Sequence, residues 1–165
     1  MAGEGNGSAS HVGAAGDPLV FRLINEIAII DQLASRLFER VMPGDLTLPQ
    51  FVVLNHFVRL GRPSSPLRLA RAFQVTKSTM TNTLQHLDRA GWVTITPDPA
   101  DARAKVVFIT EAGRAAREAA IAALAPRLAG VARGISPADV EAALPLLARL
   151  RANLDAERDT PHAAD

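Results

Sequence analysis

The sequence contains no cysteine and no tyrosine, and its other aromatic side chains are Trp92 and six phenylalanines. Without cysteine there can be no disulfide, thiolate metal ligand, cysteine nucleophile or thiol redox sensor. No apolar run approaches the ~20 residues that a membrane-spanning helix needs. These absences exclude disulfide-stapled and helical membrane proteins, and we expect a cytoplasmic protein without a membrane partner.

Patterns that carry catalysis are missing as well. No glycine-rich phosphate loop, nucleophile elbow or paired carboxylates in a plausible cleft is present. Four histidines are scattered along the chain, and none stands at metal-ligand spacing from another histidine or a carboxylate. They are His11, His56, His86 and His162. The sequence therefore predicts no enzyme, no metal site and no cofactor.

Charge is nearly balanced over the 165 residues, at +1, but it is unevenly distributed. Residues 59–105 hold eight bases and three acids, a net charge of +5. The remaining residues hold ten bases and fourteen acids, a net charge of −4. A basic middle between acidic ends favours a polyanionic partner such as nucleic acid.

Helical periodicity dominates the chain after a Gly/Ala/Ser-rich stretch, residues 1–16, which we expect to be a disordered tail rather than a signal peptide. Apolar residues from Leu19 to Val41 repeat in steps of three and four, which predicts one long helix. Asp17 is its expected cap, with Pro18 in the first turn. Pro43 and the following glycine end it.

Three shorter helices follow. Thr47–Gln50, "TLPQ", forms a capping box that opens a helix ending near Gly61. Ser65 caps a short third helix that starts with a proline. Thr76 caps a fourth helix that Gly91 terminates. Its apolar stripe leaves a polar face made of Lys77, Ser78, Thr81, Asn82 and Gln85.

Strand-like sequence occurs once, directly after these helices. Trp92–Thr96 and Lys105–Ile109 are β-rich, and the tip between them contains two prolines. Thr110 then caps a long alanine-rich helix toward residue 128. Ser136–Asp139, "SPAD", caps a last helix that reaches about residue 154, and we expect residues 156–165 to be frayed.

Three helices followed by a β-hairpin are typical of a winged helix-turn-helix, so the predicted fold is mainly α with a small β-hairpin wing. In this fold the second helix of the helix-turn-helix enters the major groove of DNA. The polar face given above therefore consists of candidate DNA contacts. Arg103 on the hairpin suits the narrow minor groove, and Asp101 can pair with it. Arg68 and Arg71 are candidate phosphate contacts.

The same residues resemble MarR-type transcription regulators. The signature of that family consists of three consecutive parts: a recognition helix, a wing with Asp-x-Arg, and Thr-x-x-Gly at the start of the next helix. "LTLPQFVVL" resembles an earlier motif of that family, at Leu46, Thr47, Gln50 and Leu54. The signature is matched by Leu87, Gly91, Trp92, Val93, Asp101, Arg103, Val107, Ile109, Thr110 and Gly113.

The resemblance implies a homodimer on a palindromic operator in double-stranded DNA. Residues 17–44 and 111–155 would form the dimerisation region, and residues 45–110 the DNA-binding domain. It also implies a repressor that a small-molecule effector releases, with His56 lining the effector cavity. Two departures stand out: Ala104 interrupts the charges that often follow Arg103, and the recognition face has no arginine.

Two alternatives remain open from the residues alone. A helical protein-interaction module could keep a winged fold without binding DNA, and the polar helix face would then be an ordinary solvated surface. A small helical enzyme would require a cleft with strongly perturbed titratable groups.

Overall fold

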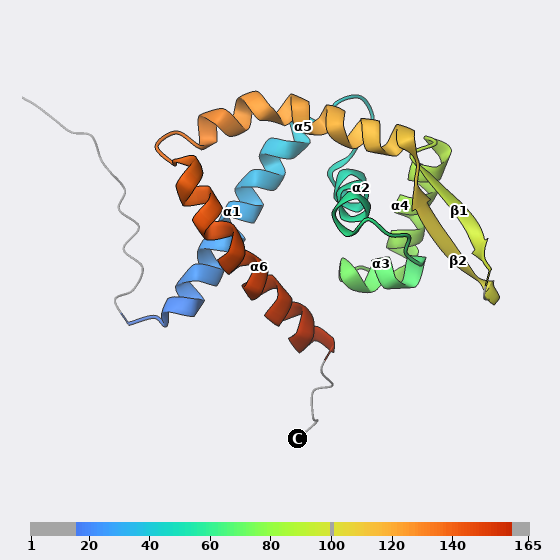
Figure 1. Ribbon diagram of the computed structural model, residues 1–165, viewed down its shortest axis with the longest axis horizontal. Coiled ribbons are helices and arrows are strands. Elements are labelled where there is room, and N and C mark those ends of the chain that lie inside the picture. Colours follow the sequence, from blue (N-terminus) through green and yellow to red (C-terminus); the bar gives the residue numbers. More distant parts are fainter. Residues whose placement is uncertain (1–15, 100, 160–165) are drawn as a thin grey trace, which may run out of the picture. The chain divides into compact units, whose positions relative to one another are not determined.

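A computed structural model describes residues 16–99 and 101–159, so the predicted N-terminal tail lies almost wholly outside the described residues. One compact unit ends at Ala123, and a second begins at Leu124. The predicted order of helices and hairpin is confirmed (Figure 1). The elements are α1 Leu19–Glu39, α2 Leu48–Leu60, α3 Pro66–Ala72, α4 Lys77–Arg89, β1 Val93–Asp98, β2 Asp101–Ile109, α5 Glu111–Val131 and α6 Pro137–Asp159.

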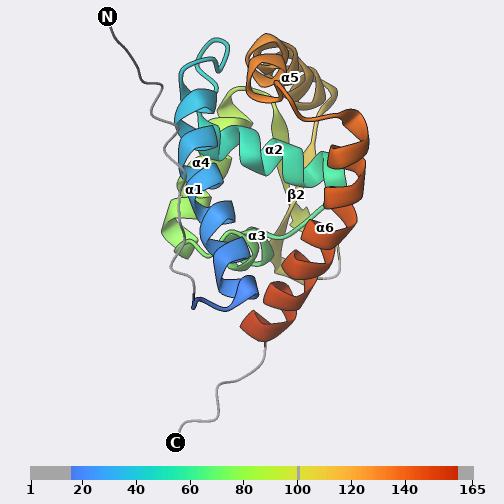
Figure 2. The same ribbon diagram turned by 90° about the vertical axis from the view of Figure 1, so that its left-hand side faces the viewer.

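The core of the first unit lies between α2, α3, α4 and the hairpin. Helix α3 packs against α4, α4 against β1, and α2 against α4 and β2. Figure 2 shows α2 running behind α1, and the rings of Phe38 and Phe51 meet edge to face with centroids 6.3 Å apart. The largest fully buried side chains are Phe57, Leu54, Leu69, Leu84, Leu87, Val53, Val93 and Val107. This architecture is a winged helix, as the sequence predicts.

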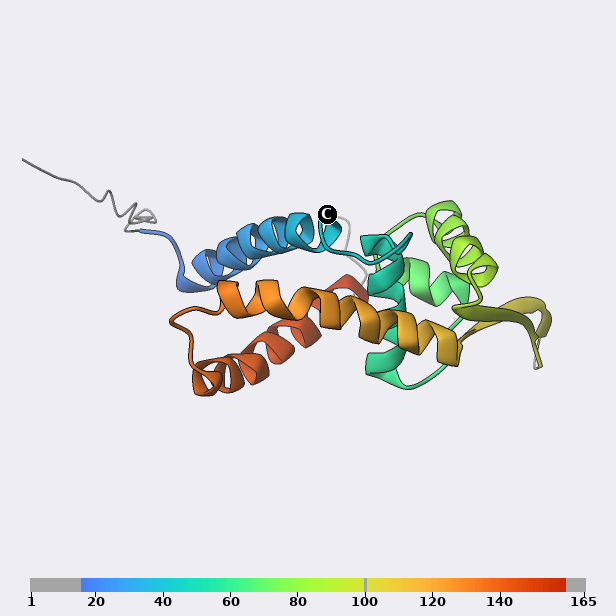
Figure 3. The ribbon, with the colours of Figure 1, turned by 90° about the horizontal axis from the view of Figure 1, so that it is seen from above.

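The hairpin is longer than the sequence predicts. Antiparallel pairing runs from Val93 opposite Ile109 to Pro97 opposite Lys105, and it then shifts so that Asp98 faces Asp101. Figure 3 shows the two strands projecting beyond α4 and α3 as a finger. Proline is tolerated in β1 because β1 is an edge strand.

Local capping signals are largely confirmed. The Thr47 N–H donates to Gln50 Oε1 at 3.0 Å, and Gly61 ends α2 with a φ of 63°. The Ser65 hydroxyl accepts from the Arg68 N–H at 3.3 Å, and α3 starts at the adjacent proline. The predicted cap of the last helix is also present, since Ser136 Oγ accepts from the Asp139 N–H at 3.2 Å.

Two boundary predictions are wrong. Pro18 occupies the N-cap of α1 with an extended ψ of 138°, so Asp17 lies one residue too early and no side chain caps the helix. At the other end, α6 continues to Asp159 and so includes residues 156–159 of the stretch expected to fray, and residues 160–165 of that stretch lie outside the described residues. An ion pair of 3.1 Å between Asp155 and Arg158 spans that last turn, which favours continued helix.

Candidate nucleic-acid interface

The exposed face of α4 is the first part of the candidate site. Met80, Leu84 and Leu87 are buried, and this stripe turns the opposite face of the helix outward. The Thr76 hydroxyl accepts from the Thr79 N–H at 3.1 Å and so fixes the start of the helix. The five predicted contacts of this helix are exposed, except for Thr81, which is half-buried.

Hydrogen bonds within α4 decide what two of its hydroxyls can offer to DNA. Thr81 Oγ1 donates to the Lys77 carbonyl oxygen at 2.7 Å, so its proton is already used. It presents lone pairs and a methyl group, which suit a base amino group or the methyl of thymine. Ser78 Oγ lies 2.8 Å from Thr76 Oγ1, which holds it near the helix start.

The inner face of the wing is the second part. Side chains alternate along a strand, so Arg103 and Lys105 share a face with Val107. Val107 is fully buried, and Ile95 opposite it is half-buried. Toward the tip the same face therefore changes from apolar core to exposed cations.

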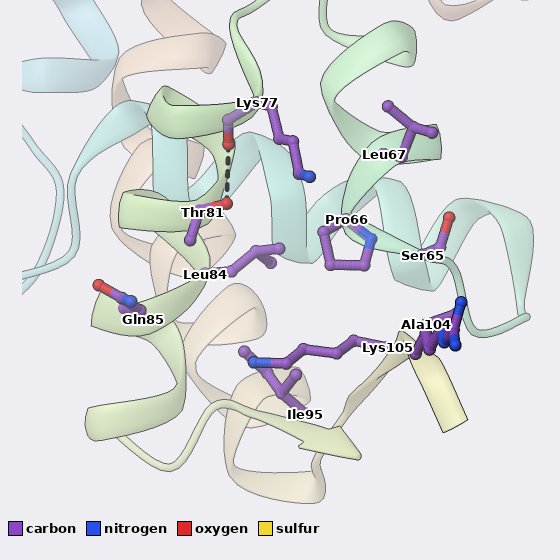
Figure 4. A pocket seen from close by; sticks show the side chains of 11 residues that line it. Ser65, Pro66, Leu67, Lys77, Thr81, Leu84, Gln85, Ile95, Ala104 and Lys105 are labelled. Carbon is purple, nitrogen blue, oxygen red and sulfur yellow. Dashed lines mark hydrogen bonds between the residues drawn. The ribbon is translucent and has the colours of Figure 1, made fainter. Parts of the chain in front are cut away.

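These two parts border a hollow of about 530 Å³ between α3, α4 and the wing, which we call the basic hollow (Figure 4). Lys77 enters it from α4 and Lys105 from β2, and Arg103 also lines it. None of its lining residues is acidic. The remaining lining residues are Ser65, Pro66, Leu67, Thr81, Leu84, Gln85, Ile95 and Ala104.

Asp101 acts on the backbone of the wing. Its Oδ1 accepts a 2.9 Å hydrogen bond from the Arg103 N–H, and no ion pair joins the two side chains in the described part of the chain. Asp101 therefore bonds to the backbone of Arg103 and not to its guanidinium, at the tip where the strand register shifts. The Arg103 guanidinium stays available for a phosphate or a minor groove.

The structure brings together only part of the predicted set. Lys77, Thr81, Gln85 and Arg103 line the basic hollow. Lys105 was not among the predicted contacts, although its spacing of two from Arg103 on a strand could have indicated it. The other predicted residues lie outside the hollow, and all of them are exposed: Ser78, Asn82, Asp101, Arg68 and Arg71.

His56 lies apart from the basic hollow, on α2. It is half-buried, and its ring centroid is 5.1 Å from that of Phe73 and 6.3 Å from that of Phe57. Burial lowers the pKa of His56 below its ordinary value of 6.5, and the positive charges of Arg59 and Arg62 lower it further. The imidazole is therefore neutral at pH 7.

Two other kinds of feature, metal-ligand clusters and membrane-spanning helices, are absent from the described residues. No group of three or more His, Cys, Asp or Glu side chains among residues 16–99 and 101–159 could hold a metal ion. No described helix is long and apolar enough to cross a membrane.

Comparison with known proteins gives the same fold. A model of the MarR family matches residues 44–104. The transcriptional regulator BldR from Sulfolobus solfataricus is 25% identical, with a TM-score of 0.69 over 81% of this chain and 95% of that one. A mutant MarR from E. coli in complex with operator DNA is 26% identical, with a TM-score of 0.61 over 81% and 99%.

A third structure is that of BpsR from Bordetella bronchiseptica, whose DNA binding is regulated by 6-hydroxynicotinic acid. It is 24% identical, with a TM-score of 0.62 over 79% of this chain and 98% of that one, and it shares the fold. The matched family is one of transcriptional regulators.

Proposed function

Because the chain belongs to the MarR family of winged-helix transcription regulators, we propose that it is a cytoplasmic homodimer that binds a palindromic operator in double-stranded DNA. The observation that carries this proposal is the basic hollow beside the polar face of α4. Cations line both sides of the hollow, on α4 and on β2, and no acid lines it. This surface fits a sugar-phosphate backbone, with base edges beyond it.

Each half of the site has its own task in this proposal. The polar face of α4 enters the major groove, where Asn82 and Gln85 suit adenine and Thr81 suits thymine. Arg103 reaches the minor groove from the wing. Lys77 and Lys105 neutralise phosphates between the two grooves, and Arg68 is a further phosphate contact. Since this face has no arginine and its lysine, Lys77, is assigned to a phosphate, guanine readout by α4 is not expected.

We also propose that the protein is a repressor whose DNA affinity falls when a small apolar or anionic molecule binds. The ligand would favour a dimer in which the recognition helices no longer match two half-sites, which lie roughly 34–36 Å apart. The known regulation of BpsR supports this part. His56, half-buried beside Phe73, is the side chain that we assign to the effector cavity.

The test begins with selection of bound duplexes from a random DNA pool. Affinity for the selected duplex should fall with salt, with a slope of about −0.9 for each phosphate neutralised. Arg103→Ala should cost about 1–3 kcal/mol per half-site, because it removes the wing's guanidinium. Arg133→Ala is the matched control, since Arg133 is an exposed arginine in the turn between α5 and α6.

Two results would contradict the proposal. Unchanged affinity of Arg103→Ala would remove the proposed minor-groove contact of the wing. No binding of the wild-type protein to any duplex at ~50 mM salt would favour the protein-interaction module instead.

A further inference from the structure

Thr110 connects three elements through a single hydroxyl group. It lies between β2 and α5, and its Oγ1 donates a 2.7 Å hydrogen bond to the Gly91 carbonyl oxygen just beyond α4. The same oxygen accepts a 3.0 Å hydrogen bond from the Gly113 N–H in the first turn of α5. Thr110 is therefore both the cap of α5 and a tie to the end of the recognition helix.

The backbone reinforces this tie. The Thr110 N–H donates to the Trp92 carbonyl oxygen at 3.1 Å. Gly113 is buried and approaches the same carbonyl so closely that a Cβ at this position would overlap its oxygen. Only glycine allows α5 to begin this near the base of the wing.

The tie reaches the buried face of α4 as well. Gly91 has a φ of 71°, and its N–H donates to the Asp88 carbonyl oxygen at 2.9 Å. The Trp92 N–H donates to the Leu87 carbonyl oxygen at the same distance, which closes the end of the helix. Because Leu87 is fully buried, a displacement of Gly91 would be passed to the recognition helix rather than absorbed.

A second contact holds α5 to the winged domain. Arg117 Nε and Nη2 donate to Asn55 Oδ1 on α2, at 3.2 and 3.0 Å. Helix α5 then continues without a break to Val131, past the boundary between the two compact units. It is therefore anchored on the DNA-binding elements at its start and belongs to the second unit at its end.

We infer that Thr110 is a positioning residue that makes α4, the wing and the start of α5 one rigid body. The inference rests on the proposed function, because it concerns how a dimer places two recognition helices on one operator. In that dimer the direction of α5 sets the separation of the two α4 helices. Thr110 passes a change in the direction of α5 on to α4. The residue itself touches no DNA.

If Thr110 positions the recognition helices, its loss should affect binding to two half-sites and not binding to a single half-site. Engaging both half-sites at once multiplies affinity by about 10²–10⁴, and this gain is lost when the geometry forbids it. Thr110→Val removes the hydroxyl and keeps the side-chain shape. It should leave affinity for a duplex with one selected half-site nearly unchanged, and lower the gain from the second half-site at least ~10-fold.

Three other variants test whether the loss of the two-site gain comes from the Thr110 hydroxyl and the position of α5. Thr110→Ser keeps the hydroxyl and should restore the gain. Thr83→Val is the matched control, because its 3.1 Å bond to the Thr79 carbonyl oxygen stays within α4, and it should change neither affinity. Gly113→Ala keeps the hydroxyl but pushes α5 away from Trp92, so it should reproduce the selective loss.

Anisotropy titrations on the one-site and two-site duplexes, with urea unfolding to verify each fold, distinguish the outcomes. Equal losses on both duplexes, or an unchanged gain in Thr110→Val and Gly113→Ala, would overturn the inference while leaving the proposed function in place. If Thr110→Val is unfolded, Gly113→Ala alone decides. A wild-type protein that binds neither duplex would overturn the proposed function, and this inference with it.

Discussion

His56 shows how a single residue is changed by its surroundings. The ring lies against Phe73 and Phe57, and two arginines of the same region add positive charge near it. Burial and these charges disfavour the imidazolium form, so the pKa of His56 is lower in the folded chain than in the unfolded chain. At acidic pH, folding therefore requires the His56 imidazole to release the proton that it binds in the unfolded chain.

The sign of the resulting pH dependence follows directly. Below pH 6.5 the unfolded chain binds a proton at this histidine that the folded chain does not bind, so the free energy of unfolding decreases as the pH falls through this value. His56→Phe should remove this contribution while keeping an aromatic ring beside Phe73. Urea unfolding between pH 7.5 and about 5 would measure it. His86→Gln, at an exposed site, is the control, and a pH dependence retained in His56→Phe would contradict the assignment.

The predictability of the site differs from residue to residue. The position of Arg103 at the basic hollow could be predicted because the Asp-x-Arg pattern at a hairpin tip is a local signal, and its contact with DNA stays a prediction. Lys105 was missed although it pairs with Pro97 in the regular part of the hairpin, where its spacing of two from Arg103 and from Val107 indicates a shared face. The backbone role of Asp101 depends on the irregular tip of the hairpin, and no short sequence rule describes that geometry.

The turn between α3 and α4 is the element that stores backbone strain. Gln74 has a φ of 52°, and it is the only described non-glycine residue with a positive value. The turn is held by bonds from the Gln74 N–H to the Arg71 carbonyl oxygen and from the Val75 N–H to the Ala70 carbonyl oxygen. Helix-turn-helix turns often use glycine here, because a side chain disfavours the left-handed region.

Replacing this glutamine should relieve the strain. The left-handed conformation costs a residue with a Cβ roughly 1–2 kcal/mol, part of which the greater freedom of glycine in the unfolded chain cancels. We expect Gln74→Gly to raise the free energy of unfolding by up to about 1 kcal/mol, measured by urea unfolding. Gln74→Ala, which keeps the Cβ, should bring no such gain, and a less stable glycine variant would disprove the strain.

Elements were predictable from the sequence where their signals are local. Periodicity and the caps at Thr47, Ser65 and Thr76 placed the helices to within a few residues, since each signal acts within one turn. Contacts between distant elements were not predictable in this way. The bond from Thr110 to Gly91 spans 19 residues and that from Arg117 to Asn55 spans 62, so both depend on the finished packing.

At the scale of the whole molecule, the chain leaves much apolar surface uncovered. The predicted stripe of α1 is only part of it, because apolar side chains outside the stripe are exposed as well. Phe21 is 56% exposed and Leu33 is 62% exposed, and no residue of α1 is buried. A helix that is apolar on most of its circumference is normally covered on several sides. Helix α6 likewise exposes Val140, Leu144, Leu146, Leu147 and Leu154.

A symmetric dimer is the simplest cover for these helices, and one substitution tests it. Ile30 is 60% exposed in the single chain, so burial in an interface would remove most of this surface from water. Ile30→Glu would place a carboxylate there, at a cost of at least about 3 kcal/mol, or more than ~100-fold in the dimer's Kd.

Sedimentation equilibrium should therefore give twice the chain mass of 17.5 kDa for the wild type and a shift toward that mass for Ile30→Glu. Gln32→Glu adds the same charge at an exposed polar position of the same helix and should stay dimeric. In the proposed mode of binding the dimer uses both half-sites, so Ile30→Glu should also lose the gain from the second half-site. A dimer that tolerates Ile30→Glu would show that Ile30 lies outside the interface, and the partner surface would then lie on other apolar residues of α1, α5 or α6.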